Sequence, residues 1–396
     1  METGTARKET SILSYGLLVM TATHTLTHVF QHIHLALFPV IRTEFNLSLL
    51  QLGLIAAIPP LCQALFYIPT GLLSDRFGSK KMIFVSSSVA ALGSLIASQT
   101  VDPTMLTLAV SLVYINTTIY HPAAYSFTSR LFRTRDRPKV LGIHGSGGTF
   151  GIAIGPISVS ILMGIFAFGW RQVYLFWFVP ILLGIVALLR IRYEPTEDVS
   201  DDTSKPESSP KNNSLYTVSL FMFLLFLAVR MTAGQMIGAF LPVYLVDEKG
   251  LSDVLSSLIY GSSSLMGLVG APVGGFLASR FGEKRWLLIV LTLSYVFLGL
   301  AVAVPNIVVF VALYLCYGFC TFLGMAANSA IMARLSPSQR RGLAYAFFFI
   351  PGSVMGAVAP LIAAYIAYAF GLTSIFVIAL VVYVVGLAVL KLGVKL

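Results

Sequence analysis

The chain has 396 residues, of which 57% are hydrophobic and 11% charged, and its mean hydropathy is +0.86. These values exclude a soluble globular protein and indicate an integral membrane protein. The net charge of +10 does not indicate nucleic-acid binding, because the lysines and arginines follow the predicted membrane topology.

Twelve apolar segments are long enough to cross a bilayer as helices. If the N-terminus is cytoplasmic, 22 of the 26 lysines and arginines lie on the cytoplasmic side and 3 on the opposite side, and Arg230 lies within a span. The positive-inside rule therefore predicts a multi-pass protein of the cell membrane with both termini in the cytoplasm. The predicted spans are 12–40, 49–74, 82–100, 103–131, 138–166, 171–192, 216–246, 252–279, 286–304, 306–334, 341–369 and 371–392.

The first span contains four histidines in the stretch THTLTHVFQHIH. His24, His28 and His32 are four residues apart, so they form one stripe along a helix, whereas His34 faces elsewhere. Because ionisable side chains are costly inside a membrane, we expect these histidines to bind substrate or protons. The alternative is that they hydrogen-bond carbonyl groups and pack helices.

A charged motif, GLLSDRFGSKK at 71–81, follows the second span. Gly78 permits a tight turn, and Asp75 can accept hydrogen bonds from helix N-terminal amides or pair with Arg130 or Arg133. Asp75 would then latch the cytoplasmic ends of the helices in an outward-open state. The alternative is that the cations of the motif only fix topology. Together with the fifth span, the motif gives a predicted gating set: Gly71, Asp75, Arg76, Gly78, Arg130, Gly151, Gly155 and Pro156.

The fourth and fifth spans add His121 and His144, and all six histidines precede residue 145. Since the fourth span runs inward and the fifth begins inside, His121 is expected on the cytoplasmic side of the middle and His144 closer still to the cytoplasm. With the stripe on the first span they predict a ladder of imidazoles, which is a plausible proton path. Further polar candidates within spans are Gln31, Gln63, Tyr114, Asn116, Tyr120, Gln235 and Asn328.

A polar segment, YEPTEDVSDDTSKPESSPKNNS, separates the sixth and seventh spans. It is rich in Pro, Ser and acidic residues and lacks apolar periodicity, which predicts a flexible cytoplasmic linker. We therefore expect an N-terminal six-helix bundle at 1–192, a linker at 193–215 and a C-terminal six-helix bundle at 216–396.

The seventh span carries Arg230 in the stretch FLAVRMTAGQ. An unpaired guanidinium is expensive inside a membrane, and no carboxylate is near it in sequence. Its expected partner is an anionic substrate, such as a phosphonate, a phosphate ester or a carboxylate. The alternative is an arginine buried against carbonyl groups or paired with a loop acid.

The two halves repeat each other at a fixed offset of 204 residues. GLLSDRFGSKK at 71–81 matches GFLASRFGEKR at 275–285, and GTFGIAIGP at 148–156 matches GSVMGAVAP at 352–360. A common ungapped register indicates duplication of a six-helix unit, and parallel repeats of this kind place a substrate site between the halves.

These motifs resemble those of a known transporter family. The segment 71–81 is similar to the loop signature of the major facilitator superfamily, with Ser79 in place of an Arg, and GIAIGP is similar to a fifth-helix motif of proton-coupled exporters. The first helix, YHPAAYSFTSRL at 120–131 and the fifth helix resemble fosmidomycin-resistance-type exporters, and His28 stands where that group has an aspartate. The resemblance implies an all-α membrane protein with twelve transmembrane helices in two six-helix parallel repeats.

No Asp or Glu falls well inside a predicted span: Asp75 directly follows the second span, and Asp253 lies at the very start of the eighth. Proton coupling would therefore need histidine, whose ordinary pKa is about 6.5. We predict a secondary transporter that works by alternating access and exports a small anionic or amphipathic molecule in exchange for protons. Two alternatives stay open: uptake or facilitated diffusion of an organic anion, and divalent-metal transport with His24, His28 and His32 as ligands.

Other classes of function have little support in the sequence. The three cysteines lie within spans and form no CxxC motif, and no Ser-His-Asp constellation can be built, so neither an enzyme nor a cofactor site is predicted. The expected partners are a small anionic molecule, protons and membrane lipids, with no nucleic acid, and the expected state is a monomer.

Overall fold

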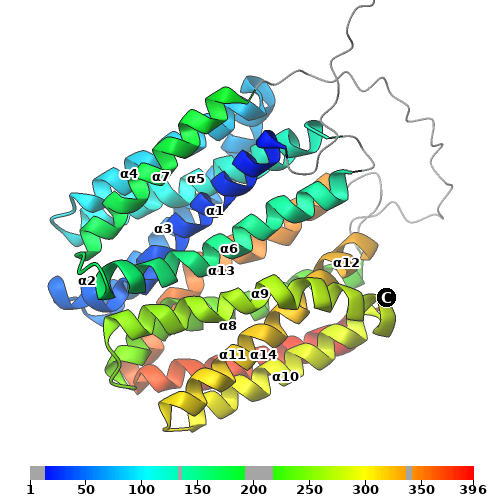
Figure 1. Cartoon of the computed structure of the whole chain (residues 1–396). Coiled ribbons are helices and arrows are strands. Elements are labelled where there is room, and N and C mark those ends of the chain that lie inside the picture. Colours follow the sequence, from blue (N-terminus) through cyan, green and yellow to red (C-terminus); the bar gives the residue numbers. More distant parts are fainter. Residues whose placement is uncertain (1–13, 133–135, 192–216, 336–340) are drawn as a thin grey trace, which may run out of the picture.

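The computed structural model describes residues 14–132, 136–191, 217–335 and 341–396, with side chains at 68, 71, 72, 75, 138 and 341–350 left undescribed. All regular structure within these residues is helical, as the sequence predicts (Figure 1). The helices are α1 Tyr15–Ala36, α2 Phe38–Glu44, α3 Leu49–Phe77, α4 Ser79–Ser98, α5 Pro103–Arg130, α6 Arg137–Gly164, α7 Trp170–Arg190, α8 Val218–Asp247, α9 Asp253–Phe281, α10 Glu283–Ala303, α11 Ile307–Leu323, α12 Met325–Leu335, α13 Arg341–Phe370 and α14 Leu372–Gly393.

Twelve predicted spans become fourteen helices because the first and tenth spans are interrupted. The first breaks at Leu37, just before Pro39, which lacks a backbone N–H and sits at the start of α2. The tenth breaks at Gly324, between α11 and α12. The other ten predicted spans each correspond to one continuous helix.

Ten of the described segments are both long and apolar enough to cross a bilayer, and α1 and α5 are not among them. Both carry many polar side chains: α1 contains four histidines, and α5 contains His121 together with several threonines. Elsewhere large apolar side chains face outward, as Leu183 and Phe276 do, at 66% and 67% exposure, which suits contact with lipid. These two long helices therefore carry polar side chains within an otherwise lipid-compatible bundle.

The duplication appears in the backbone as well as in the motifs. The described residues with positive φ form three pairs: Asn46 with Gly250, Gly78 with Gly282, and Ala167 with Gly371. Each pair is 204 residues apart. Equivalent turns of the two halves thus share an unusual backbone conformation, even where the second half has a glycine and the first has not.

The two halves lie side by side and meet along two helix pairs (Figure 1). In one pair, a Cβ on Gly261 of α9 would stand 2.8 Å from the Ala153 carbonyl oxygen of α6. In the other, a Cβ on Gly53 of α3 would stand 2.4 Å from the Ala364 side chain of α13. Small residues therefore allow the halves to approach backbone to backbone.

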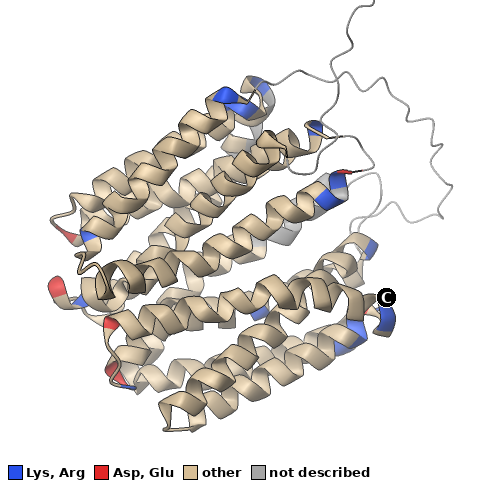
Figure 2. Cartoon of the chain, viewed as in Figure 1, with Lys and Arg blue, Asp and Glu red and all other residues tan. Residues whose placement is uncertain are grey.

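The charges divide between the two ends of the bundle. Figure 2 shows most described lysines and arginines at the end where the chain terminates, and most acidic residues at the other end. At this acidic end Arg171 pairs with Glu44 at 2.6 Å, and Arg42 of α2 pairs with Asp247 of α8 across the two halves. The acidic end is thus held by ion pairs, one of which bridges the repeats.

Candidate functional site

The histidines of α1 face α6, and glycines on α6 allow the two helices to come very close. A Cβ on Gly151 would stand 2.3 Å from the Thr25 carbonyl oxygen, and one on Gly148 would stand 2.8 Å from Cε1 of His24. Any larger residue would have to displace the backbone or the imidazole. The glycine-rich face of α6 therefore shapes the wall against which the α1 histidines lie.

Four histidines from three helices form one cluster, which we call the imidazole cluster: His24 and His28 on α1, His121 on α5 and His144 on α6. The ring of His24 stacks on that of His144 with centroids 4.3 Å apart, and it lies 4.9 Å from His28 and 5.3 Å from His121. His28 and His121 are also 5.3 Å apart. The structure thus gathers these side chains into a compact group.

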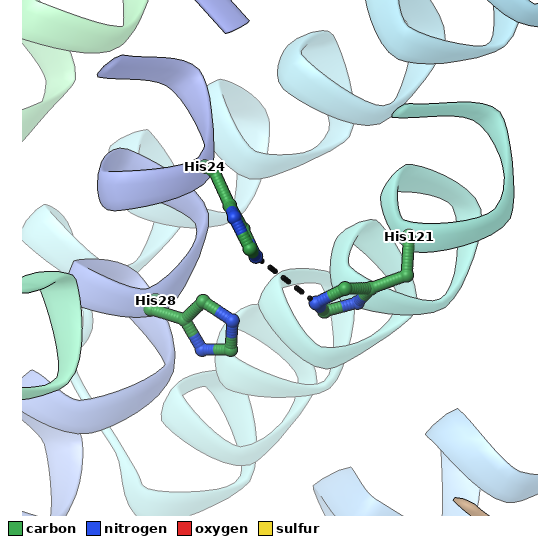
Figure 3. A group of neighbouring side chains, drawn as sticks. All are labelled: His24, His28 and His121. Carbon is green, nitrogen blue, oxygen red and sulfur yellow. Dashed lines mark hydrogen bonds between the residues drawn. The ribbon is translucent and has the colours of Figure 1, made fainter. Parts of the chain in front are cut away.

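Hydrogen bonds fix the proton on two of these rings. Nδ1 of His24 lies 2.8 Å from the His144 carbonyl oxygen, and Nδ1 of His121 lies 2.8 Å from the Thr117 carbonyl oxygen. A carbonyl oxygen only accepts, so each Nδ1 carries the hydrogen and each neutral ring presents a lone pair at Nε2. The two Nε2 atoms are 3.4 Å apart and face each other (Figure 3).

The remaining histidines extend the cluster on one side only. The His32 ring lies 6.0 Å from that of His28, and its Nδ1 donates to the His28 carbonyl oxygen at 2.9 Å. His34 lies apart, buried against Tyr114 and Phe38. The spacing by four therefore distinguished the clustered histidines from His34.

Two other sequence candidates support the cluster rather than enlarge it. Gln31 hydrogen-bonds the imidazole of His28. The Tyr120 hydroxyl is fully buried, lies 2.9 Å from the Thr23 hydroxyl and donates to the Met20 carbonyl oxygen at 2.9 Å. With its hydroxyl engaged in this way, Tyr120 contributes mainly its ring, which stacks on His24 at 5.6 Å.

Arg230 lies in the other half, among three tyrosines on three further helices. It hydrogen-bonds the hydroxyl of Tyr295 and interacts electrostatically with the hydroxyls of Tyr317 and Tyr383. The rings of Tyr295 and Tyr383 stack at 4.1 Å, and the Tyr317 and Tyr383 hydroxyls are 3.0 Å apart. No carboxylate among the described side chains pairs with this half-buried guanidinium.

The three tyrosines, which we call the tyrosine triad, were not predicted from the sequence. They lie on α10, α11 and α14, which are distant in sequence from Arg230, and tyrosine is common in membrane helices. Gly148 was also missed as a contact of the histidines, although it lies within the glycine-rich stretch after His144. Only the three-dimensional packing relates the tyrosine triad to Arg230 and Gly148 to the histidines.

The predicted gating residues fall into three groups. The side chains of Gly71 and Asp75 lie outside the described part of the chain, so the latch stays a prediction. Gly78 forms the turn between α3 and α4 with φ of 83°, flanked by exposed Arg76, and Arg130 is the last residue of α5. The fifth-span residues Gly151, Gly155 and Pro156 all lie within α6, where the two glycines pack on α1.

The described residues offer one arrangement of ligand atoms suited to a metal ion: a ring nitrogen from each of His24, His28 and His121, all within 4.8 Å of one another. His32, which the sequence grouped with the first two, is replaced in this set by a residue from α5. The three cysteines are free, and Cys316 is exposed.

The sequence model of the Major Facilitator Superfamily matches residues 20–274 and 223–395. The fosmidomycin resistance protein of Escherichia coli (strain K12) is 24% identical over 278 residues, which cover 68% of this chain and 67% of that protein. The probable nitrate transporter NarT of Staphylococcus epidermidis is 26% identical over 341 residues, covering 83% of each. A bacterial homologue of the human lysosomal transporter Spinster, in an inward-facing and occupied conformation, superposes with a TM-score of 0.83 at 18% identity, covering 98% of this chain and 97% of its own.

Proposed function

Because the chain belongs to the Major Facilitator Superfamily, we propose that this secondary transporter exports a small anion by alternating access, in exchange for protons. The observation that carries the proposal is the setting of Arg230, a half-buried guanidinium that faces tyrosine hydroxyls and has no carboxylate partner among the described side chains.

The chemistry around Arg230 suits an oxyanion. The guanidinium offers paired N–H donors in a plane, and the tyrosine triad adds O–H donors and aromatic walls. An anion bound at this position would offset the free-energy cost of holding the Arg230 guanidinium within the membrane. A small planar or tetrahedral oxyanion, such as nitrate, a carboxylate or a phosphonate, fits these donors, and the similarity to NarT favours an anion as well.

The imidazole cluster is the proposed site for the coupling protons. No described acidic side chain lies in the middle of a helix, and the described Asp and Glu residues occupy helix ends and loops. In the cluster, the facing lone pairs of His24 and His121 form a natural acceptor for a shared proton. Protons would therefore bind to the first half of the chain and the anion to the second half.

We further propose that both termini are cytoplasmic and that the protein acts as a monomer in the cell membrane. The bias of lysines and arginines toward one end supports the orientation. Placing that end in the cytoplasm also puts the ion pair between Arg42 and Asp247 at the outer face, so the described contacts between the halves would close the outer side.

Anion binding can be tested by thermal stabilisation of the purified full-length protein. We expect nitrate, acetate or methylphosphonate to raise the unfolding temperature in a saturable way, and Arg230→Gln to abolish the shift. Arg285→Gln, which removes an exposed arginine near the start of α10, should leave the shift intact. An undiminished shift in a folded Arg230→Gln protein would refute the assignment.

The direction of transport distinguishes export from uptake. If the anion is exchanged for protons, the two move across the proteoliposome membrane in opposite directions. A proton gradient should then drive the anion toward the side where the proton concentration is higher. Anion movement along with the protons would instead favour uptake, and indifference to the gradient would favour facilitated diffusion.

A further inference from the structure

From the geometry of the imidazole cluster we propose that the chain binds a divalent transition-metal ion through His24, His28 and His121. This proposal goes beyond anion transport and does not depend on the role of Arg230; a bound metal ion would compete with the coupling proton for the Nε2 lone pairs of His24 and His121. It is argued from the positions of the ligand atoms, from the lone pairs they present and from the charge around them.

The spacing of the ligand atoms matches metal coordination. With Zn–N bonds of about 2.0–2.1 Å and tetrahedral angles, two imidazole ligands have nitrogens about 3.3 Å apart. The Nε2 atoms of His24 and His121 are 3.4 Å apart, and the ring nitrogen of His28 completes a triangle with no side above 4.8 Å. Only the third ligand has to move to close the site.

The Nε2 lone pairs of His24 and His121 point toward each other, as two ligands of one metal ion would. Hydrogen bonds to backbone carbonyl groups hold the hydrogens of His24 and His121 on Nδ1, away from each other. The facing Nε2 atoms are therefore both acceptors, which repel unless a cation lies between them. An imidazole whose other nitrogen donates to a carbonyl is also the usual state of a metal-bound histidine, because the bond fixes the ring and raises its basicity.

The charge around the trio favours an ion with affinity for nitrogen. Three neutral imidazoles suit zinc, nickel, copper or cobalt, whereas magnesium and calcium require oxygen ligands. No described carboxylate joins the trio. A bound divalent ion would keep a net positive charge, so its fourth coordination position would take water or a small anion.

The glycine wall of α6 leaves little room for rearrangement. A Cβ on Gly148 would stand 2.9 Å from Nε2 of His24 and 3.0 Å from Cδ2 of His28, and the ring of His144, also on α6, stacks on that of His24. His24 is therefore held in place before a metal binds, which favours a site of defined geometry over adventitious binding.

Cobalt(II) titration of the purified full-length protein, after removal of any affinity tag, tests the proposal. We expect one Co²⁺ per chain, visible absorption bands of a tetrahedral nitrogen-bound ion, and displacement by Zn²⁺. His121→Gln should weaken binding by at least about tenfold, since even loss of an outer-shell partner typically costs that much. His34→Gln is the matched control, because His34 is buried on the other face of α1, and it should bind as the natural protein does.

A second variant keeps the test decisive if His121→Gln fails to fold. His121→Cys replaces one metal ligand by another, so it should keep the stoichiometry and add an intense sulfur-to-cobalt absorption band in the near ultraviolet. Absence of saturable binding to the natural protein would overturn the proposal. So would binding by His121→Cys without the new band, because the metal would then lie elsewhere.

Discussion

At the scale of single residues, the ionisable side chains of the membrane region, the imidazole cluster and Arg230, lie at positions where the two repeats differ. Shifting by 204 residues takes His24, His28 and His121 to Ala228, Thr232 and Met325, and takes Arg230 back to Leu26. The halves share turns and the cations of the loop motif, but not the ionisable side chains within the membrane. We infer that duplication provided the scaffold and that later substitutions gave the first half its imidazoles and the second half its guanidinium.

Tyr383 tests whether the tyrosine triad contacts the anion. Tyr383→Phe removes the hydroxyl that lies 3.0 Å from Tyr317 but keeps the ring stacked on Tyr295. Loss of one hydrogen bond of about 0.5–1.5 kcal/mol predicts roughly a two- to twelvefold rise in the anion concentration for half-maximal transport. Tyr368→Phe is the control, because Tyr368 is 70% exposed near the end of α13. Equal behaviour of the two variants would remove the triad from the site.

Glu44 gives a pH dependence of stability at the acidic end. The Arg171 guanidinium, and secondarily the Trp170 indole N–H, hold the pKa of the Glu44 carboxyl below its usual value. Because the pKa of the Glu44 carboxyl is lower in the folded than in the unfolded state, ionised Glu44 stabilises the fold at pH values above its unfolded-state pKa. This stabilisation is lost as the pH falls through the folded-state pKa. The half-exposed pair should be worth at most about 1 kcal/mol.

The measurement is the unfolding temperature of natural protein and Glu44→Gln between about pH 6 and pH 3. We expect Glu44→Gln to be less stable at the higher pH and to lose less stability on acidification. A parallel shift of both curves would show that this carboxyl does not contribute to acid sensitivity. Exposed Glu248→Gln controls for removal of a charge from the same end.

At the scale of helices, the contact of α1 with α6 determines the site. Polar α1 depends on close packing, and the glycines of α6 provide it. The identity of these helices could be predicted from segment length and hydropathy, whereas their contact could not, because apolar composition does not say which helices are neighbours. The interruption at Leu37 was missed for a similar reason: an apolar segment continues smoothly through it.

Alanine substitutions at two glycines of α6 distinguish the effect of close helix packing from the effect of helix propensity. A Cβ at Gly151 would stand 2.3 Å from the Thr25 carbonyl oxygen, whereas one at Gly145 meets nothing within 4 Å. Gly151→Ala should lower the unfolding temperature and disturb the imidazole cluster, and Gly145→Ala should be neutral or stabilising by up to about 1 kcal/mol. Thermal unfolding of both variants checks this. Equal stability would mean that α1 and α6 can separate without cost.

At the scale of the whole molecule, the contacts between the halves describe one state of a transport cycle. The ion pair between Arg42 and Asp247 and the hydrogen bond from the Ser257 hydroxyl to the Ala36 carbonyl oxygen at 3.1 Å both join the halves at the acidic end. If that end is extracellular, these contacts must break for the protein to open outward. The predicted Asp75 latch would then act in the opposite state, at the other end.

Substitutions in the ion pair between Arg42 and Asp247 should shift the equilibrium between the closed and open states of the acidic end. Asp247→Asn should weaken closure at the acidic end and increase the outward-open population, and Arg42→Asp combined with Asp247→Arg should restore it. Distances between spin labels placed at the acidic ends of α6 and α9 would report the change. An unchanged distance distribution in Asp247→Asn would show that the pair does not control opening.

The sequence predicted the class of fold, the twelve spans and the repeat, because the length of apolar segments and motifs repeated at a fixed offset can be read directly from the sequence. It also selected His24, His28, His121 and Arg230, since ionisable residues in apolar segments stand out. It related the α5 and α6 histidines to those of α1 only as a ladder in depth and not as one compact cluster, and it did not predict that tyrosines surround the arginine. Those relations depend on side-chain contacts between helices far apart in sequence.

Anion flux in proteoliposomes, measured for nitrate, acetate and methylphosphonate with and without a proton gradient, tests the central claim most directly. We predict that at least one of these anions moves faster when the gradient is imposed, toward the side from which protons flow, and that Arg230→Gln stops the movement while Arg285→Gln does not. Flux that ignores the gradient, or that persists undiminished in a folded Arg230→Gln protein, would contradict proton-coupled export of an anion through Arg230.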